Sequence, residues 1–283
     1  MGPVASRLSG DRLHLQHGPI DLIIGADGNR EAAFQAAARR FENILDELVS
    51  ELPLLRQEHP HSTLPVGSIA LRMVKATRPL ARFGLLTPMA AVAGSVAEEV
   101  LRAMTAVPLH RAFVNNGGDI ALHLDADQTY ATGISASDGR AFGRIALRTT
   151  DTARGIATSG RHGRSLSRGI ADSVTVLART AAMADAAATV IANAVDLPGH
   201  PAIRRQPAND VVDDSDLGNL PVVTRVASLS TADANAALLA GSACAEALQQ
   251  DGLIEGAALF LQDEAQMIGA PALSLTTRTP AHA

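Results

Sequence analysis

Hydrophobic and polar residues first alternate along the chain and then recur at helical spacing, which predicts a β-hairpin followed by a helix. Residues 11–16 alternate between polar and apolar, and after the turn at residues 17–19 we predict residues 20–25 as the hairpin partner. From residue 30 to residue 52, apolar side chains recur every three or four positions, which indicates one long amphipathic helix. We expect Pro53 to end that helix, because proline has no N–H for the next helical hydrogen bond.

The following segment carries a weaker strand signal and a stronger helix signal. Residues 68–74 alternate in part, so we predict a strand there and a linker over residues 78–87. Thr87 and Pro88 form a typical helix start, which predicts a helix over residues 88–106. Small residues in its first half suit either tight helix packing or an anion at the helix N-terminus, and the sequence leaves both open.

Short strands and alanine-rich helices follow through the rest of the chain. The pattern predicts two strands within 112–124, strands at 130–135, 143–148, 155–160, 173–178 and 222–226, a turn at 137–139, helices at 183–195 and 233–250, and a closing hairpin within 253–268. Residues 196–220 lack periodicity and read as a long loop or lid. We therefore predict the α+β class, with a mixed or mostly antiparallel sheet and packed helices, as one domain over residues 1–275 with a tail at 276–283.

Composition narrows the class of protein. Of the 283 residues, 47% are hydrophobic but only 2% are aromatic, so alanine, valine and leucine build the core. The net charge of −5 argues against a protein that binds nucleic acid. Since no apolar run reaches the ~18 residues that a membrane span needs, we expect a cytoplasmic protein without a membrane partner. Cys244 is expected to be a buried small residue, and His59 and His61 to be loop residues rather than metal ligands.

The densest candidate chemistry lies between residues 155 and 195. Thr-Ser-Gly at 158–160 ends a strand, and a basic loop rich in glycine and serine follows over residues 161–169. The next helix carries Asp185 and Thr189, which are four positions apart and therefore share one face. A carboxylate and a hydroxyl are ligands that Mg²⁺ takes when phosphate oxygens complete its shell. An acid near a helix start also fits an ordinary contact with the helix dipole.

A glycine pair provides a second candidate motif, Asn-Gly-Gly-Asp at residues 116–119. Adjacent glycines permit positive φ and bring bare backbone N–H groups close to a ligand such as phosphate. The same residues also fit an ordinary hairpin turn between two strands. The sequence leaves a phosphate-binding turn and a purely structural turn equally open.

These motifs, taken in order, resemble the ApbE-like superfamily, whose best-known members are Mg²⁺-dependent FAD:protein FMN transferases. Ala-Asp-Ala-Ala-Ala-Thr at 184–189 is similar to the helix start whose Asp and Thr contact Mg²⁺ in that family, which implies that Asp185 and Thr189 are metal ligands. The Thr-Ser-Gly element is similar to the family's strand end near the flavin nucleotide, and Gly-Gly-Asp also has a counterpart. The order and rough spacing agree over about residues 85–195, and the chain looks closest to a shorter branch of the superfamily.

The chain departs from the family pattern at two places. The transferases carry His-Ile-Ile-Asp-Pro, whose His is linked to catalysis, where this chain has Leu-Ser-Arg-Gly-Ile-Ala-Asp at residues 166–172. Ala-Gly-Ser at residues 93–95 replaces the family's Lys-Gly-Tyr. The resemblance therefore implies that the metal and pyrophosphate parts are kept, while the flavin-specific and acid–base parts are altered.

The expected site combines a metal, a diphosphate and basic side chains. Mg²⁺ on Asp185 and Thr189 would share the diphosphate with loop arginines, although a solvated basic loop is the alternative for those arginines. The candidate ligand-binding residues are Asn116, Gly117, Gly118, Asp119, Thr158, Ser159, Gly160, Arg161, Arg164 and Arg168. His162 is the nearest candidate general base, and Asp185 is the second candidate catalytic residue.

Two functions stay open at this stage. The first is an Mg²⁺-dependent enzyme that acts on a flavin nucleotide (FAD or FMN) or a similar diphosphate, with flavin transfer as one candidate reaction. The second is a non-catalytic protein that binds a flavin or a pterin-like ring on the same fold. The 2% aromatic content leaves few stacking partners, so aliphatic and backbone contacts would recognise a ring. A homodimer is compatible with the sequence, but no sequence feature requires it.

Overall fold

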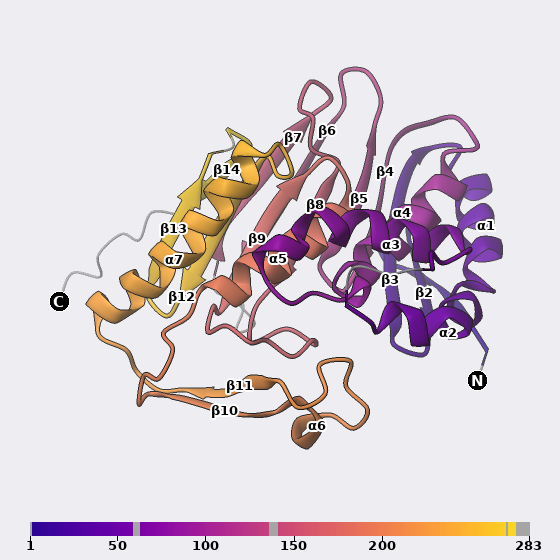
Figure 1. The fold of residues 1–283 in the computed structure, drawn as a ribbon. Helices are drawn as coiled ribbons and strands as arrows, with labels where there is room; N and C mark the ends of the chain where they lie inside the picture. The colour runs from indigo at the N-terminus through magenta and orange to yellow at the C-terminus, as the bar shows by residue number, and fades with distance from the viewer. Residues whose placement is uncertain (1, 59–62, 136–140, 270, 276–283) are drawn as a thin grey trace.

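One long antiparallel sheet runs through the molecule (Figure 1). The computed structural model describes residues 2–58, 63–135, 141–269 and 271–275. The sheet has nine strands in the order β1-β2-β3-β4-β5-β8-β9-β12-β13, and every neighbouring pair is antiparallel. Its strands are β1 Val4–Leu8, β2 Arg12–His17, β3 Ile20–Gly28, β4 Leu109–Asn116, β5 Asp119–Leu124, β8 Gly155–Ser159, β9 Ser173–Ala178, β12 Gly256–Leu261 and β13 Glu264–Ile268.

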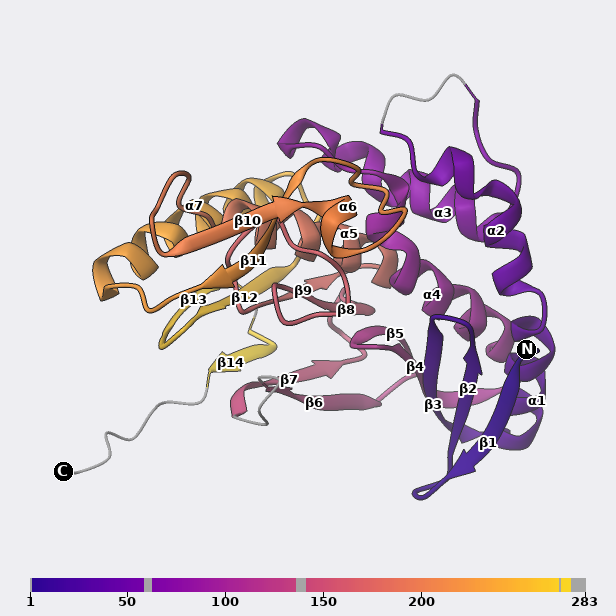
Figure 2. The same ribbon diagram turned by 90° about the horizontal axis from the view of Figure 1, so that it is seen from below.

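Helices cover one face of this sheet, and a smaller sheet covers part of the other (Figure 2). The helices are α1 Arg30–Phe41, α2 Ile44–Leu55, α3 Ser68–Thr77, α4 Val92–Met104, α5 Ala181–Ala194 and α7 Thr231–Gln250. The smaller sheet consists of β6 Thr129–Ser135, β7 Ala141–Arg148 and β14 Leu273–Leu275, in the order β14-β7-β6. The two cores follow strand alternation, because Val174 and Val176 face the helices while Leu177 faces the smaller sheet. The predicted α+β class with a mostly antiparallel sheet is confirmed.

Helices α4 and α5 cross so closely that only small residues fit between them. A Cβ atom on Gly94 of α4 would lie 2.3 Å from the Ala181 carbonyl oxygen. Strand β8 approaches the start of α5 as closely, since a Cβ atom on Gly155 would lie 2.2 Å from the Thr180 carbonyl oxygen. Most alanines of α5 are fully buried, which explains the unusual composition of this helix. Close packing of backbones thus takes the place of the large side chains that the sequence lacks.

Glu98 of α4 satisfies the first turn of α5. The backbone N–H of Ala182 donates to Glu98 Oε1 at 2.8 Å, and the Thr180 hydroxyl caps the same helix by accepting from Met183 N–H at 3.2 Å. Burial raises the pKa of Glu98, although these backbone donors and Arg72 act in the opposite direction. The N-terminus of α5 is therefore occupied by protein groups rather than held open for a ligand.

Three arginines surround the buried carboxylate of Glu99, which is 1% exposed. Arg40, Arg72 and Arg102 contact it at 2.9, 3.1 and 2.8 Å, and so join α1, α3 and α4. Burial alone would raise the pKa of Glu99, but the hydrogen bonds from Arg102, Arg40 and Arg72 outweigh it and hold the pKa well below its usual range. This network ties together the helices that flank the site described below.

The structure corrects three sequence-based predictions in the first third of the chain. The strand predicted at residues 68–74 is wrong, because α3 occupies this segment with Ile69, Ala70, Met73 and Val74 buried at helical spacing. The single helix predicted over residues 30–52 is two helices, since the chain bends between Phe41 and Ile44. Pro53 lies inside the last turn of α2 rather than ending it.

Two connecting segments are also more ordered than predicted. Residues 78–87, predicted as a linker, contain the short 3₁₀ helix η1 Arg78–Phe83, and a second one, η2 Pro88–Ala91, leads into α4. The predicted loop at 196–220 contains β10 Ile203–Pro207 and the one-turn helix α6 Ala208–Val211, and β10 pairs with β11 Pro221–Val226. The expectations for His59 and His61, for the turn at 137–139 and for the tail at 276–283 fall outside the described residues.

Within the described ranges, no single helix is both long and apolar enough to cross a membrane. Two consecutive helical segments, Ser68–Phe83 and Pro88–Met104, reach that length and apolarity only when they are joined across a bend of 116°.

The close crossing predicts a large effect of one methyl group. Gly94→Ala should lower the free energy of unfolding by roughly 2 kcal/mol, because overpacking at the Ala181 carbonyl exceeds the gain in helix propensity. Urea denaturation would measure this loss. Gly133→Ala is the matched control, since a Cβ there meets no atom within 4 Å. Equal stability of the two variants would contradict the packing argument.

The Glu99 network predicts a stability effect that depends on pH. Glu99→Gln should cost roughly 3 kcal/mol at pH 7, because it leaves three arginines without their buried partner. A carboxylate with a lowered pKa contributes its stability above the ordinary glutamate pKa of about 4.3, and that contribution is lost as pH falls below this value. Denaturation midpoints measured from pH 7 to pH 3 should therefore converge for wild type and variant. A constant difference across this range would rule out the ionic role.

Candidate functional site

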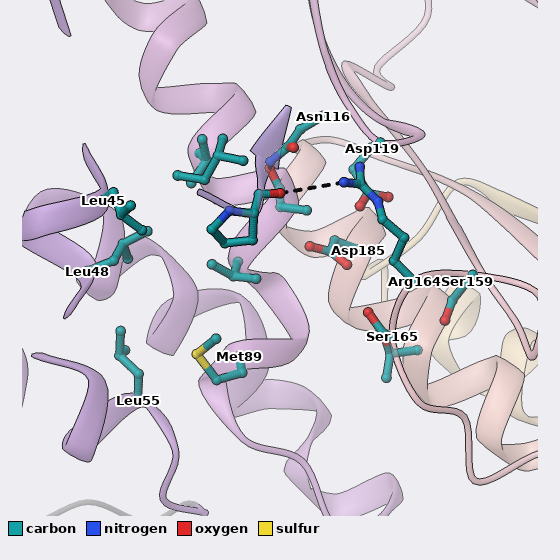
Figure 3. Close-up of a pocket in the computed structure, with 18 of the residues that line it drawn as sticks. Leu45, Leu48, Leu55, Met89, Asn116, Asp119, Ser159, Arg164, Ser165 and Asp185 are labelled. Carbon is teal, nitrogen blue, oxygen red and sulfur yellow. Dashed lines mark hydrogen bonds between the residues drawn. The ribbon is translucent and has the colours of Figure 1, made fainter. Parts of the chain in front are cut away.

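A pocket of about 710 Å³ opens where α2, the start of α4 and the ends of β4, β5 and β8 meet. Figure 3 shows leucines of α2 on one side of it and Asp119, Asp185 and Arg164 on the other. The apolar wall consists of Pro19, Ile20, Leu45, Leu48, Val49, Leu52, Leu55, Met89, Val92 and Val96. One end of this central pocket is thus aliphatic and the other is polar and charged.

Asp185 lies on α5 and faces the N-terminus of α4. Its Oδ2 accepts the backbone N–H of Gly94 at 2.9 Å, so the carboxylate caps the neighbouring helix. Burial and repulsion from Asp119 raise the pKa of Asp185 well above its usual value, and backbone donors from Gly94 and Ala93 offset this only in part. The side chain is therefore positioned by helix packing in a place where its negative charge is unfavourable.

Asp119 is the second acid of the pocket, at the first position of β5. It is 9% exposed, and its Oδ1 accepts the backbone N–H of Thr158 at 3.2 Å. Burial raises the pKa of Asp119 to about 7, against the effects of Thr158 N–H and the nearby Arg164 guanidinium. Two carboxyl groups with raised pKa values thus share one enclosed space, where a bound cation would stabilise their ionised forms.

The donor set fits a hard divalent cation. Asp119 and Asp185 offer carboxylate oxygens, and the Thr189 hydroxyl lines the same pocket one helical turn from Asp185. Asn116 is buried beside them, with its Nδ2 donating to the Ala93 carbonyl at 3.1 Å. Within the described residues, no three His, Cys, Asp or Glu side chains converge, so an ion here would take its remaining ligands from a bound compound or water.

The Gly117-Gly118 motif serves as a turn and also lines the pocket. Both glycines have positive φ, 66° and 115°, and Asn116 pairs with Asp119 across the turn. A Cβ on Gly117 would lie 2.0 Å from Arg164 Nη2, so glycine leaves the room that the arginine occupies at the mouth of the pocket. Gly118 faces away from the central pocket, because its N–H donates to Asn115 Oδ1 at 2.8 Å and it lines a different cleft.

The basic loop after β8 divides its side chains between two places. Ser159, Gly160 and Arg164, three of the predicted ligand-binding residues, line the central pocket. Arg161 and His162 do not, because both contact the carboxylate of Asp172, at 2.6 and 3.2 Å. Arg161, predicted to clamp phosphate, and His162, predicted to be a general base, therefore lie outside the lining of the central pocket.

Thr158 and Arg168 occupy intermediate positions. The Thr158 backbone N–H donates to Asp119, but the Thr158 hydroxyl lies 3.0 Å from that of Thr175 on the opposite face of the sheet. Arg168 lines an adjoining pocket of about 400 Å³ that shares Asp119, Asp185 and Thr189 with the central one. The Arg168 Nε is buried and has no hydrogen-bond partner among the described residues.

The segment that borders this adjoining pocket was expected to be a solvated loop, with cation binding as the weaker alternative for its acid run. Residues 212–217 line it, and Asp214 pairs with Arg56 at 2.6 Å while Asp216 accepts from the Thr87 hydroxyl at 2.8 Å. The acid run at 213–216 was the available signal, but charge alone does not identify its partners. The aliphatic wall on α2 was missed, because its leucines read simply as the buried face of a helix.

Comparisons with known proteins identify the family. The family model described as "AbpE bacteria" matches residues 5–267. The chain belongs to this family. The predicted ApbE-like resemblance is thus confirmed at the level of the family.

Two archaeal relatives of this ApbE-like chain are UPF0280 proteins. One from Methanopyrus kandleri is 36% identical over 177 residues, which cover 61% of this chain and 69% of the relative. One from Methanococcus vannielii is 34% identical over 154 residues, which cover 53% of this chain and 61% of the relative. The match with the second relative therefore spans about three fifths of that protein's length.

Solved structures show the same fold at low sequence identity. The flavin transferase ApbE from Vibrio cholerae superposes with a TM-score of 0.53 at 15% identity, over 95% of this chain and 98% of that one. A variant of the same transferase gives a TM-score of 0.51 at 14% identity, over 93% of this chain and 98% of that one. At such identities the likeness establishes the fold alone.

The acid pair predicts that removing one charge stabilises the protein without added metal. A raised pKa means that ionisation of Asp119 opposes folding, so its stabilising contribution is complete below pH 4 and is lost as pH rises through about 7. Asp119→Asn should therefore gain roughly 2 kcal/mol over wild type at pH 8 and nothing at pH 4. Thermal unfolding in the presence of a chelator would test this. A gain that does not depend on pH would refute the electrostatic explanation.

Proposed function

We propose that this protein is an Mg²⁺-dependent enzyme that acts on a flavin nucleotide, FAD or FMN, or on a similar diphosphate in the central pocket. The observation that carries the proposal is the acid pair of Asp119 and Asp185 beside the Thr189 hydroxyl. Repulsion between two enclosed carboxylates favours a bound cation, and Arg164 at the same end suits phosphate oxygens.

The shape and polarity of the pocket support a ligand with a charged and an uncharged end. The volume of about 710 Å³ lies within the range of small-molecule and cofactor sites. The phosphates would lie at the acid pair, and the aliphatic wall of α2 would cover the uncharged part. Membership of the ApbE-like family and the fold shared with a flavin transferase support a flavin nucleotide as that ligand.

The residues of this chain would have separate roles. Asp119, Asp185 and Thr189 would hold Mg²⁺, which supplies neutralisation of charge on a phosphate when it is bound. Arg164 would orient phosphate oxygens, since it is exposed and already lies across Gly117 with its Nη1 3.5 Å from the Pro19 carbonyl. Gly117 would keep that position open. Asn116 would hold the start of α4 against the acid pair through the Ala93 carbonyl.

A non-catalytic protein that binds a flavin or a pterin-like ring is the second candidate. The observation that favours it is the position of His162, which lies with Asp172 outside the central pocket. Among the described residues that line the central and adjoining pockets there is no histidine. Release of AMP from FAD with Mg²⁺, measured by chromatography, distinguishes the two, because a binding protein would return FAD intact.

Ligand-dependent thermal stability tests the site itself. FAD at about 100 times its Kd should add roughly 2.7 kcal/mol to wild type in the presence of Mg²⁺, and the gain should vanish in Asp185→Ala. FMN, ADP and ATP, each with and without Mg²⁺, show which part of the ligand is needed. A shift that persists without Mg²⁺ or in Asp185→Ala would sink the proposed metal–diphosphate site.

A pair of variants in one loop provides the matched control. Arg164→Ala should raise the apparent Kd for FAD in the presence of Mg²⁺ at least fivefold, because a charge-assisted hydrogen bond is lost. Arg161→Ala should lower the stability of the unliganded protein but leave the ligand-induced shift in place, since Arg161 contacts Asp172 instead.

A further inference from the structure

A second cleft lies on the opposite face of the nine-stranded sheet. It has a volume of about 390 Å³ and is enclosed by the ends of β5, β8 and β9 on one side and by β6 and β7 on the other. Gly117, Thr158, Ser159 and Gly163 line both this cleft and the central pocket. The turn after β4 and the loop after β8 therefore form the partition between the two spaces.

Three hydroxyl groups form the floor of this cleft on two neighbouring strands. Thr158 and Thr175 are paired across β8 and β9, and their hydroxyl oxygens lie 3.0 Å apart. Ser173 is 7% exposed, and its Oγ has no hydrogen-bond partner within the described structure. A threonine pair uses one of its two hydroxyl protons internally, so the floor keeps at least two hydroxyl donors and several lone pairs for a ligand.

An unpartnered buried hydroxyl is a costly feature in a folded protein. A buried polar group without a partner loses its hydration and regains nothing, so such groups are rare in native structures. Ser173 follows Asp172 at the start of β9, and Thr175 is 2% exposed on the same strand face. The simplest partner for Ser173 is a group that enters the cleft.

The described lining of this cleft carries no unbalanced charge. Among its described lining residues only His162 and Asp172 can be charged, and they contact each other at 3.2 Å. Asp172 is further held by Arg161 and by the backbone N–H of Gln262. Phosphate, carboxylate and ammonium groups would therefore meet no complementary free charge here, in contrast to the central pocket.

The wall opposite the hydroxyls is largely apolar, although two hydroxyl side chains of β6 also line it. Ile134 and Ile145 of the smaller sheet line it, together with Phe142, which stacks on Phe260 with ring centroids 4.3 Å apart. A ligand would thus meet hydrogen-bonding groups on one side and aliphatic and phenyl surface on the other. Sugars and polyol chains present hydroxyls and C–H groups in this way.

We infer that this cleft is a binding site for an uncharged, hydroxyl-bearing group such as a polyol chain or a sugar, recognised by Ser173, Thr175 and Thr158. The inference goes beyond the proposed function, because it needs neither Mg²⁺ nor a phosphate. The ligand's hydroxyls complete the hydrogen bonding of Ser173 and of the threonine pair, and its C–H surface packs on Phe142 and Ile134.

Riboflavin and lumichrome provide a matched pair of fluorescent probes, since both are uncharged near neutral pH but only riboflavin carries a polyol chain. When each probe is titrated into the full chain in the presence of a chelator, the Kd of riboflavin should be at least fivefold lower than that of lumichrome. Ser173→Ala and Thr175→Val should each weaken riboflavin binding about fivefold, which corresponds to one lost hydrogen bond. The lumichrome affinity should stay unchanged in both variants.

Ser242→Ala is the control, because Ser242 Oγ is also buried without a partner in the described structure but lies on α7, away from the cleft. Ser173→Ala and Ser242→Ala should each keep or raise the unfolding midpoint, and only the first should weaken riboflavin binding. Equal affinities for riboflavin and lumichrome, riboflavin binding indifferent to Ser173 and Thr175, or no binding at millimolar riboflavin would each overturn the inference. Because no metal or phosphate is present, failure here is separate from failure of the Mg²⁺-dependent site.

Discussion

The site depends on the mutual capping of two helices by two carboxylates. Glu98 leaves α4 and accepts an N–H from the first turn of α5, and Asp185 leaves α5 and accepts an N–H from the first turn of α4. Burial raises the pKa of both acids, so neither position is favourable for charge by itself. Each carboxylate reaches the first turn of the other helix because Gly94 lets the two backbones approach closely. The proposed metal ligand is therefore held by the same interaction that holds the helices together.

The arrangement around β8 separates two kinds of chemistry across one sheet. The Thr158 N–H donates to Asp119 on the helix face, and the hydroxyls of Thr158 and Thr175 share a hydrogen bond on the other face. Charged groups gather on the helix face, where Asp119 and Asp185 repel each other. Neutral hydroxyls gather on the other, where Asp172 is already paired. A strand with alternating side chains achieves this separation within a few residues.

Much of the fold was accessible from the sequence, and the reasons for the failures are physical. Alternation predicted the strand at 11–16 correctly, its hairpin partner at 20–25 followed from the turn between them, and a continuous apolar run predicted the buried strand at 173–178. The spacing of Asp185 and Thr189 placed both in one pocket. Residues 68–74 were misread because a short apolar segment satisfies strand and helix periods almost equally. The local sequence pattern is least informative where long-range contacts decide between a strand and a helix.

The candidate site was predicted less completely than the fold for the same reason. Arg161 and Arg164 look alike in sequence, but Asp172, just before the next strand, engages only the first. The polar contacts of Asp214 and Asp216 join segments more than a hundred positions apart. Sequence motifs located the residues that carry their own signature, while partners that depend on long-range geometry became visible only in the structure.

The alanine content of α5 has a consequence for how this protein can diverge. Ala181, Ala184 and Ala187 are fully buried, and the backbone of Ala181 lies against Gly94. Larger residues at these positions would push α4 and α5 apart and break the two caps between them. Amino-acid substitutions should therefore accumulate slowly along this helix and faster on exposed strands such as β1. Sequences descended from one ancestor would then be most similar around Asp185 and least similar at the sheet edge.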